Sequence, residues 1–454
     1  MRADPRYPAV LVLVLLGAFT KSAQFPFHFW LPHAMAAPTP VSAYLHSATM
    51  VKLGVFLLAR LYPTLGGTDL WFYVVCGTGL VTMTLGAAVA IFQQDLKGLL
   101  AYSTISHLGL ITFLFGLDSQ LAVVAGLFHI LNHAAFKASL FMAAGIIDHE
   151  CGTRDMRQLN GLWHFMPITA TLAMVAASAM AGVPLLNGFL SKEMFFAETI
   201  DLDAHHVIEW AVPVIATLAA TMAVTYSVRF IHDVFFNGEP VGLTKTPHEP
   251  PRWMRVPVDI LVVLCLAVGI FPNWTVGPVL AVMVRGTLQG VLPEYSLALW
   301  HGFNLPLLMS TIALVAGVAA YFGLQRTINL HSVTRLPVSG KHVFDALVAA
   351  LTSLAGIVIK WLPATSLPRH LVWIVLTVMA VMAWPLARIG GGAPPLLTLQ
   401  IDTPNALIGS TIWIIGVGAA LAATIAYRER LHALILLGAA GLAVSLTFVM
   451  FSAP

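Results

Sequence analysis

The stretch TKSAQFPFHFWLPHAMAAPTPVSAYLHSATMVKLG, residues 20–54, combines features that oppose one another in an ordinary membrane helix. It is apolar enough for a bilayer, yet it contains lysines, histidines and four prolines. A charged side chain at the bilayer centre costs at least about 2.5 to 3.5 kcal/mol on insertion scales. Proline in addition breaks a helix. Both features are unfavourable in hydrocarbon, so together they indicate a functional break in a membrane span.

The composition sets the fold class. Hydrophobic residues make up 58% of the 454 positions and charged residues 9%, against about 25% charged in ordinary soluble domains. Apolar runs of membrane-spanning length, about 20 residues each, recur along the whole chain. We therefore expect an all-α polytopic membrane protein with about 13 or 14 transmembrane helices. The expected spans are 8–30, 41–63, 70–92, 98–116, 121–147, 162–198 (broken), 208–236, 256–272, 273–290, 303–323, 343–363, 369–388, 406–427 and 432–451.

Charge and cysteine content exclude several classes. Cys76, Cys151 and Cys265 have no CxxC spacing, which argues against a disulfide framework or a metal site. The net charge of +3 is small and dispersed, so we expect no nucleic-acid partner and no cofactor. Lysines and arginines occur in one set of alternating loops (31–40, 93–97, 148–160 and 237–255) and not in the other (64–69, 117–120 and 199–207). The positive-inside rule places the first set in the cytoplasm.

The segment FHILNHAAFKASLF contains the clearest group of ionisable residues. His129, His133 and Lys137 are spaced i, i+4, i+8, which confines them to one helix face. Histidines satisfied within a core are one interpretation. A metal site is another, but the segment HILNH, which contains Asn132, lacks the glutamate of the HExxH motif of zinc hydrolases, and a lysine is a poor ligand. The third is a proton relay, because imidazole titrates near neutral pH and burial disfavours a charged lysine.

Similar elements occur elsewhere. In AYSTISHLGLI, Ser103 and His107 are four residues apart, and in YLHSATMVKLG, His46 and Lys52 are six apart. These hydroxyl, imidazole and amine groups suit a relay, although hydroxyls in helices often bond only to their own backbone. Arg229 and Lys360 instead fit side chains that extend from a helix end to the membrane surface.

Two spans are interrupted beside a lysine. Pro26 follows Lys21, and Gly182, Pro184 and Gly188 precede Lys192. Unwound backbone at membrane depth is tolerated only where it lines a cavity or packs within protein. A pair of interrupted spans in corresponding halves is the best sequence indication of a transport site. The sequence thus predicts two discontinuous helices, each with a functional lysine.

The four motifs together resemble a known family. TKSAQFPFHFWLPHAMAAPTPVSAYLHSATM, QQDLKGLLAYSTISHLGLI, HILNHAAFKASLF and AGVPLLNGFLSKE are similar to the antiporter-like membrane subunits shared by respiratory complex I and the Mrp-type cation/proton antiporters. The similarity covers about residues 10–275. It implies an inverted repeat of five-helix units, each with a broken helix, and a hydrated polar axis along the membrane midplane.

The resemblance assigns roles by motif. Lys21 corresponds to the broken-helix lysine of the first unit, with His46 beside it. Lys137 corresponds to the central lysine of the second unit, and Lys192 to its terminal lysine. The implied path runs from Lys21 through His46 to Lys137. The relay residues expected from the motifs are Lys21, His46, Lys52, His107, His129, His133, Lys137, Lys192 and Glu193, with Glu193 and Lys192 controlling exchange with the far side.

Lys52 favours one branch of the family. In HSATMVKLG it resembles the A-type subunits of the Mrp antiporters, and YRERLHALILLGAAGLAVSLTFVMFSAP resembles the C-terminal part of those subunits. The expected function is a proton-conducting subunit of a Na+/H+ antiporter in the bacterial cell membrane, without enzymatic activity, acting with other membrane subunits in pH homeostasis. The alternatives are a proton-pumping subunit of NADH:quinone oxidoreductase and an intramembrane metal hydrolase.

The resemblance also implies an organisation of the chain. We expect residues 1–66 to end a first repeat unit, 67–240 to form a second, 241–300 to connect, and 301–454 to dock partner subunits. The family has a glutamate on an earlier helix and an acidic motif further on. Neither is in this sequence, so we expect the natural frame to extend beyond both ends.

Overall fold

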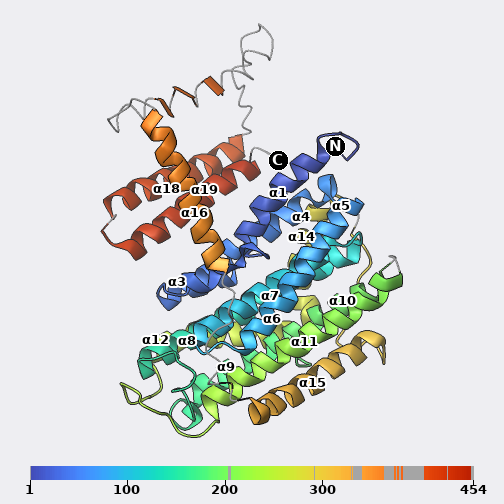
Figure 1. The fold of residues 1–454 in the computed structure, drawn as a ribbon, viewed down its shortest axis with the longest axis vertical. Coiled ribbons are helices and arrows are strands. Elements are labelled where there is room, and N and C mark those ends of the chain that lie inside the picture. Colours follow the sequence, from blue (N-terminus) through green and yellow to red (C-terminus); the bar gives the residue numbers. More distant parts are fainter. Residues whose placement is uncertain are drawn as a thin grey trace. The chain divides into compact units, whose positions relative to one another are not determined.

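The computed structural model describes residues 2–202, 206–290, 292–328, 330, 340–361, 403–426 and 428–450, and single positions between 373 and 381. Within them the chain is helical (Figure 1). It forms two compact units, Met1–Thr352 and Ser353–Pro454, each considered by itself. The four-part division expected from the sequence stays a prediction.

The helices of the first unit alternate between long spans and short pieces. In chain order the elements are α1 (Tyr7–Lys21), η1 (Phe27–Phe29), α2 (Trp30–Ala34), α3 (Thr39–Ser47), η2 (Met50–Lys52), α4 (Leu53–Leu65), α5 (Asp69–Trp71), η3 (Phe72–Cys76), α6 (Gly77–Ile91), α7 (Leu96–Gly116), α8 (Gln120–Cys151), η4 (Leu162–His164), α9 (Pro167–Ala181), α10 (Asn187–Ile200), α11 (His206–Phe235), α12 (Arg252–Ile270), α13 (Pro272–Thr275), α14 (Gly277–Leu288) and α15 (Leu305–Thr327). Then follow α16 (Gly340–Trp361), α18 (Thr403–Ile425) and α19 (Arg430–Met450).

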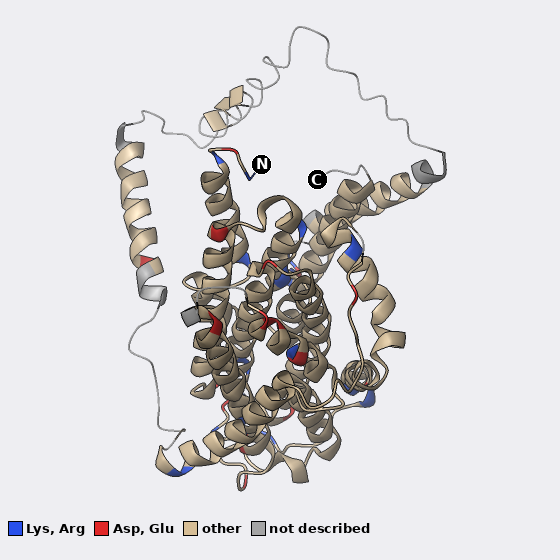
Figure 2. Ribbon diagram, turned by 90° about the vertical axis from the view of Figure 1, so that its right-hand side faces the viewer, with Lys and Arg blue, Asp and Glu red and all other residues tan. Residues whose placement is uncertain are grey.

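Many of these helices are suited to a bilayer. Eight in the described chain are long and apolar enough to cross a membrane, and five more are apolar but shorter. Figure 2 shows how few basic and acidic positions interrupt the helices. The prediction of an all-α polytopic membrane protein is thereby confirmed. The expected span 343–363 corresponds to α16, whereas the expected span 369–388 lies outside the described residues apart from single positions.

Both predicted helix breaks are present. α1 ends at Lys21, and the chain turns through Ala23 (φ +48°) before η1 begins. α9 ends at Ala181, and Gly182 (φ +90°) and Leu185 (φ +69°) lead into α10. Glycine at this C-terminal position is favoured because it adopts a left-handed conformation without steric cost. A Cβ at Gly182 would in addition approach Cδ of Lys192 to 2.8 Å, so glycine leaves room for the lysine stem.

Close packing of α10 against α9 gives a first prediction. A Cβ at Gly188 would collide with the Ala179 carbonyl, so Gly188→Ala should push the two half-helices apart. We expect a loss of about 1 to 3 kcal/mol, as for other overpacked cores. The measurement is the thermal midpoint of the purified full-length protein in detergent.

Gly323→Ala on α15 is the matched control, because a Cβ there meets nothing within 4 Å. It should leave the midpoint unchanged or raise it slightly, since alanine favours helix more than glycine does. Equal midpoints for the two variants would contradict the close approach of α9 and α10.

A buried ion pair joins α11 to its neighbours. The Arg229 and Asp233 side chains are 0% and 2% exposed, with Nε 3.1 Å from Oδ2. Arg229 also donates to the Ile91 carbonyl and to Oε1 of Gln94 (2.9 Å), while the Tyr321 hydroxyl donates to Asp233 Oδ1 (2.6 Å). The interpretation of Arg229 as a side chain extending to the membrane surface is therefore wrong. Asp233 follows Arg229 at the i+4 spacing that allows an ion pair on a helix, but this spacing does not show whether the arginine lies inside the bundle or at its surface.

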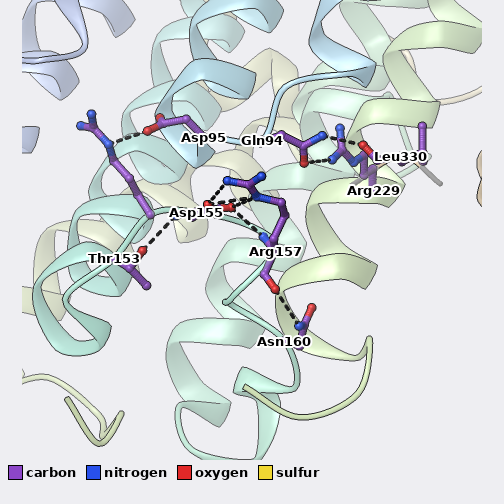
Figure 3. Close-up of polar contacts among 9 residues, drawn as sticks. Gln94, Asp95, Thr153, Asp155, Arg157, Asn160, Arg229 and Leu330 are labelled. Carbon is purple, nitrogen blue, oxygen red and sulfur yellow. Dashed lines mark hydrogen bonds and ion pairs between the residues drawn. The ribbon is translucent and has the colours of Figure 1, made fainter. Parts of the chain in front are cut away.

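The loops nearby are fixed by further polar contacts (Figure 3). Gln94, which Arg229 contacts, donates to the Leu330 carbonyl (2.5 Å). Arg154 pairs with Asp95 (2.5 Å), and Arg157 pairs with Asp155 through Nη2 and Oδ2 (2.5 Å). The hydrogen bonds that Arg157 donates to Asp155 raise the pKa of its guanidinium. The Arg154–Asp95 pair holds the loop 152–160 against the start of α7, and the Arg157–Asp155 pair lies within that loop.

Removing one member of the buried pair should be costly. Arg229→Met leaves the Asp233 carboxylate buried without its cation, and breaking such a pair typically costs about 3 to 5 kcal/mol. The thermal midpoint of the full-length protein should fall accordingly. The double variant Arg229→Met/Asp233→Leu should recover much of the loss, because no uncompensated charge remains. A double variant no more stable than the single one would contradict this account.

Candidate functional site

Two histidines form the centre of the polar site. His107 of α7 and His129 of α8 are 3% and 0% exposed. Nδ1 of His107 lies 2.9 Å from Nε2 of His129. The chain of contacts extends in both directions, because His107 Nε2 is 3.3 Å from the Tyr226 hydroxyl and His129 Nδ1 is 2.9 Å from the Ser191 hydroxyl. This hydrogen-bonded row thus links α11, α7, α8 and α10.

His133 lies one turn further along α8. Its ring centroid is 5.3 Å from that of His107 and 6.4 Å from that of His129, and all three rings pack against Phe136. Both of its ring nitrogens are buried. Lys52 approaches the same turn, since Nζ donates to the Ile130 carbonyl at 2.5 Å. The structure therefore brings Lys52 to the histidine cluster.

Two lysines meet at the end of α9. Lys137 is fully buried; it donates to the Ser103 hydroxyl, and its Nζ lies 3.2 Å from Sδ of Met180. Lys192 donates to the carbonyls of Met180 and Ala181, both at 2.8 Å. Met180 thus contacts both lysines, one through its sulfur and the other through its carbonyl oxygen. Among the described residues these partners, like that of Lys52, are neutral, so a proton can leave each amine without separating an ion pair.

Lys21 and His46, the first residues of the predicted path, are not connected to the histidine cluster by any contact among the described residues. His46 is 1% exposed, and its ring lies among Trp30 and Phe141, each at a centroid distance of 6.4 Å. Lys21 ends α1 with an exposed side chain. Among the described contacts none joins Lys21 to His46 or to the histidine cluster. The roles of Lys21 and His46 stay predictions.

Glu193 provides an acidic position next to Lys192. It is 6% exposed, and its Oε1 lies 3.5 Å from Nδ1 of His301. Asn132, between the two histidines of α8, donates from its side-chain amide to the Asn187 backbone carbonyl (2.8 Å), and its own backbone carbonyl accepts from the Asn187 side-chain amide (3.3 Å). These amides hold α8 against the start of α10.

Several residues of the site were not expected from the sequence. Ser191 directly precedes Lys192 in the SKE motif, and this position could have identified it as a candidate relay residue. Tyr226 and Met180 have none, because an aromatic or a methionine in an apolar helix usually packs in the core. His301 lies in a segment that we interpreted only as a docking surface.

Comparisons with known proteins show which families and proteins the sequence resembles. Residues 2–220 match the family described as NADH:quinone oxidoreductase/Mrp antiporter, TM, and residues 415–454 match the family model for the D subunit of MBH. The chain is 56% identical over 468 residues to the A/B subunit of a "Probable K(+)/H(+) antiporter" from Rhizobium meliloti (strain 1021), covering 100% of this chain and 46% of the relative. It is 37% identical over 472 residues to the A subunit of a "Na(+)/H(+) antiporter" from Bacillus subtilis (strain 168), covering 98% and 58%.

A solved structure agrees with these relatives. A chain in the Mrp complex from Dietzia sp. DQ12-45-1b is 34% identical, with a TM-score of 0.69, and the similarity covers 100% of this chain and 49% of that one. The chain spans about half the length of the curated relatives that it matches. Residues 2–220 thus match the NADH:quinone oxidoreductase/Mrp antiporter transmembrane family, and the chain is similar along nearly its whole length to A-type antiporter subunits.

Proposed function

We propose that this chain forms part of the proton-conducting subunit of a multi-subunit monovalent cation/proton antiporter in the bacterial cell membrane. One observation carries the proposal: Lys52, the three histidines, Lys137 and Lys192 lie buried around α8, and all of them except His133 have short polar contacts to neutral groups. A fixed structural role would not need three lysines bound to neutral acceptors in one apolar bundle. A relay needs groups that gain and lose protons at low cost.

The mechanism follows from the spacing of these groups. His107 and His129 share a hydrogen bond, so when one ring is protonated to an imidazolium it can pass a proton to the neutral ring of the other. The hydroxyls of Tyr226 and Ser191 lie at the outer ring nitrogens and can hold each ring in the matching tautomer. Lys137 and Lys192 are coupled by charge, because both contact Met180. A proton on one lysine disfavours a proton on the other. A cation that moves at one end of the antiporter thereby changes whether Lys137 and Lys192 are protonated. Protons move inward while the cation leaves the cell.

This role involves no covalent chemistry. The relatives are named as antiporter subunits, which supports a transporter rather than an enzyme. The same family model also covers NADH:quinone oxidoreductase, so an NADH-driven proton pump is the alternative. NADH oxidation coupled to proton pumping in the purified complex would establish that alternative.

The partners that we propose are other membrane subunits. The Dietzia relative was solved as part of an Mrp complex, and residues 415–454 match a subunit model of another membrane assembly. Only 6% of the apolar stretch of α19 is buried within this chain. Its exposed faces are therefore available for lipid or for further subunits.

Lys137 provides the direct test. In the complete antiporter complex reconstituted in proteoliposomes, Lys137→Ala should abolish cation/proton exchange, since it removes the amine between Ser103 and Met180. Exchange is measured by a pH-sensitive dye inside the vesicles after a cation gradient is applied. Lys245→Ala is the control, because Lys245 lies in an exposed loop and donates to the His149 carbonyl. Normal exchange by Lys137→Ala would contradict the relay.

The coupled cation is a second question. Na+ is the cation implied by the family resemblance and not by any particular residue, whereas the relative at 56% identity is named for K(+)/H(+) exchange, so K+ is the second candidate. Comparing exchange driven by equal gradients of Na+, K+ and Li+ in the unmodified complex separates the two. We expect Na+ to give the fastest exchange, and a clear preference for K+ would replace sodium in the proposal.

A further inference from the structure

His301 is a more exposed ionisable group that lies beside the buried residues on the Lys192 side of the site. It is in the loop between α14 and α15, and its side chain is 32% exposed, whereas that of Glu193 is 8% exposed. The 3.5 Å separation between His301 Nδ1 and Glu193 Oε1 allows direct proton exchange after a small movement. A carboxylate that is nearly buried thus contacts an imidazole open to the surroundings.

This pair is adjacent in sequence to one member of the lysine row, which consists of Lys137 and Lys192. Lys137 is 0% exposed, Lys192 is 5% exposed, and Glu193 directly follows Lys192 on α10. Lys137, Lys192 and Glu193 are therefore all buried, whereas His301 is partly exposed. A path from the interior of the bundle to its surface requires such a change from buried to exposed groups.

The contacts of α10 and α15 indicate which surface this is. Further along α10, Glu198 accepts a hydrogen bond from Ser119 (2.6 Å), and Ser119 belongs to a loop without lysine or arginine. At the other end of α15, Leu330 contacts Gln94, beside the loop that contains Lys97. α15 hence begins on the non-cytoplasmic side, and His301 is four residues before its first residue.

We propose that His301 is the group through which the lysine row exchanges protons with the non-cytoplasmic side. The His301 imidazolium gives its proton to the Glu193 carboxylate, the resulting carboxylic acid passes it to the neutral Lys192 amine, and His301 takes a new proton from water. His301 and Glu193 thereby return to their starting states, and Lys192 carries the proton onward as an ammonium group. The inference rests on the proposed relay, and it reverses the direction suggested by the sequence, because protons are taken up at the Lys192 end.

A structural ion pair is the competing explanation, and chemical rescue distinguishes it. In the complete complex, His301→Ala should lower exchange by on the order of 10-fold or more, since it removes a positioned proton donor. Imidazole added outside should restore a large part of the lost rate, because the side chain that it replaces is accessible. A purely structural contact would not be restored by a free proton carrier.

His232 offers a matched control. Its side chain is 29% exposed and its Nδ1 lies 3.9 Å from a carboxylate oxygen of Asp233, but it belongs to the Arg229 network rather than to the lysine row. Imidazole should not change the rate of His232→Ala beyond its effect on the unmodified complex. Equal responses of the two variants would overturn the assignment of His301.

Chemical labelling tests, independently of transport, whether position 301 is accessible from the non-cytoplasmic side of the membrane. His301→Cys in right-side-out vesicles should react with a membrane-impermeant maleimide, over the background of the unmodified complex; Cys76, Cys151 and Cys265 are buried. Labelling only from the cytoplasmic side, or from neither side, would overturn the proposal. If His301→Ala does not assemble, His301→Gln replaces it in the rescue experiment.

The two proposals fail in different ways. Exchange that persists in Lys137→Ala contradicts the relay itself. Exchange that is lost in Lys137→Ala but not rescued by imidazole in His301→Ala contradicts only the role of His301.

Discussion

The contact on which the site depends is between Lys192 and the end of α9. Burying an ammonium group in an apolar bundle is unfavourable unless acceptors replace its water. The last carbonyls of a helix have no partner within that helix, and the helix dipole places roughly half a negative charge at this end. The carbonyls of Met180 and Ala181 thus bind the Lys192 amine at 2.8 Å each. A continuous helix would have used these carbonyls in its own hydrogen bonds.

The break therefore has a chemical purpose as well as a geometric one. Gly182 ends α9 in a conformation that exposes the carbonyls and leaves room for the lysine stem. Asn187 and Gly188 then hold the start of α10 against α8 and α9. The acceptors are dipoles and not carboxylates, so they stabilise the charged amine without fixing it in that state.

Arg229 shows the opposite solution in the same bundle. Its guanidinium is always protonated at physiological pH, and Asp233 neutralises it at 3.1 Å while Tyr321 holds the carboxylate. Such a pair cannot exchange a proton readily, and it serves to join α11 to α15 and to the loop before α7. The bundle therefore contains two kinds of buried cation. Arg229 is paired with an anion and anchors helices, whereas Lys192 is bound by neutral acceptors and can exchange a proton.

The sequence by itself determined the membrane class, the helical fold, the two breaks and the ionisable residues of α8, because apolar run length, proline and glycine positions and helical spacing are local properties. It did not distinguish Arg229 from an arginine that extends to the membrane surface, and it did not indicate Met180, Tyr226 or His301 as partners. Those depend on which helix lies opposite, and only the tertiary structure decided this. The reason is that an apolar helix can pack equally well on many neighbours by pattern alone, whereas a hydrogen bond or ion pair forms with one particular atom at one particular distance.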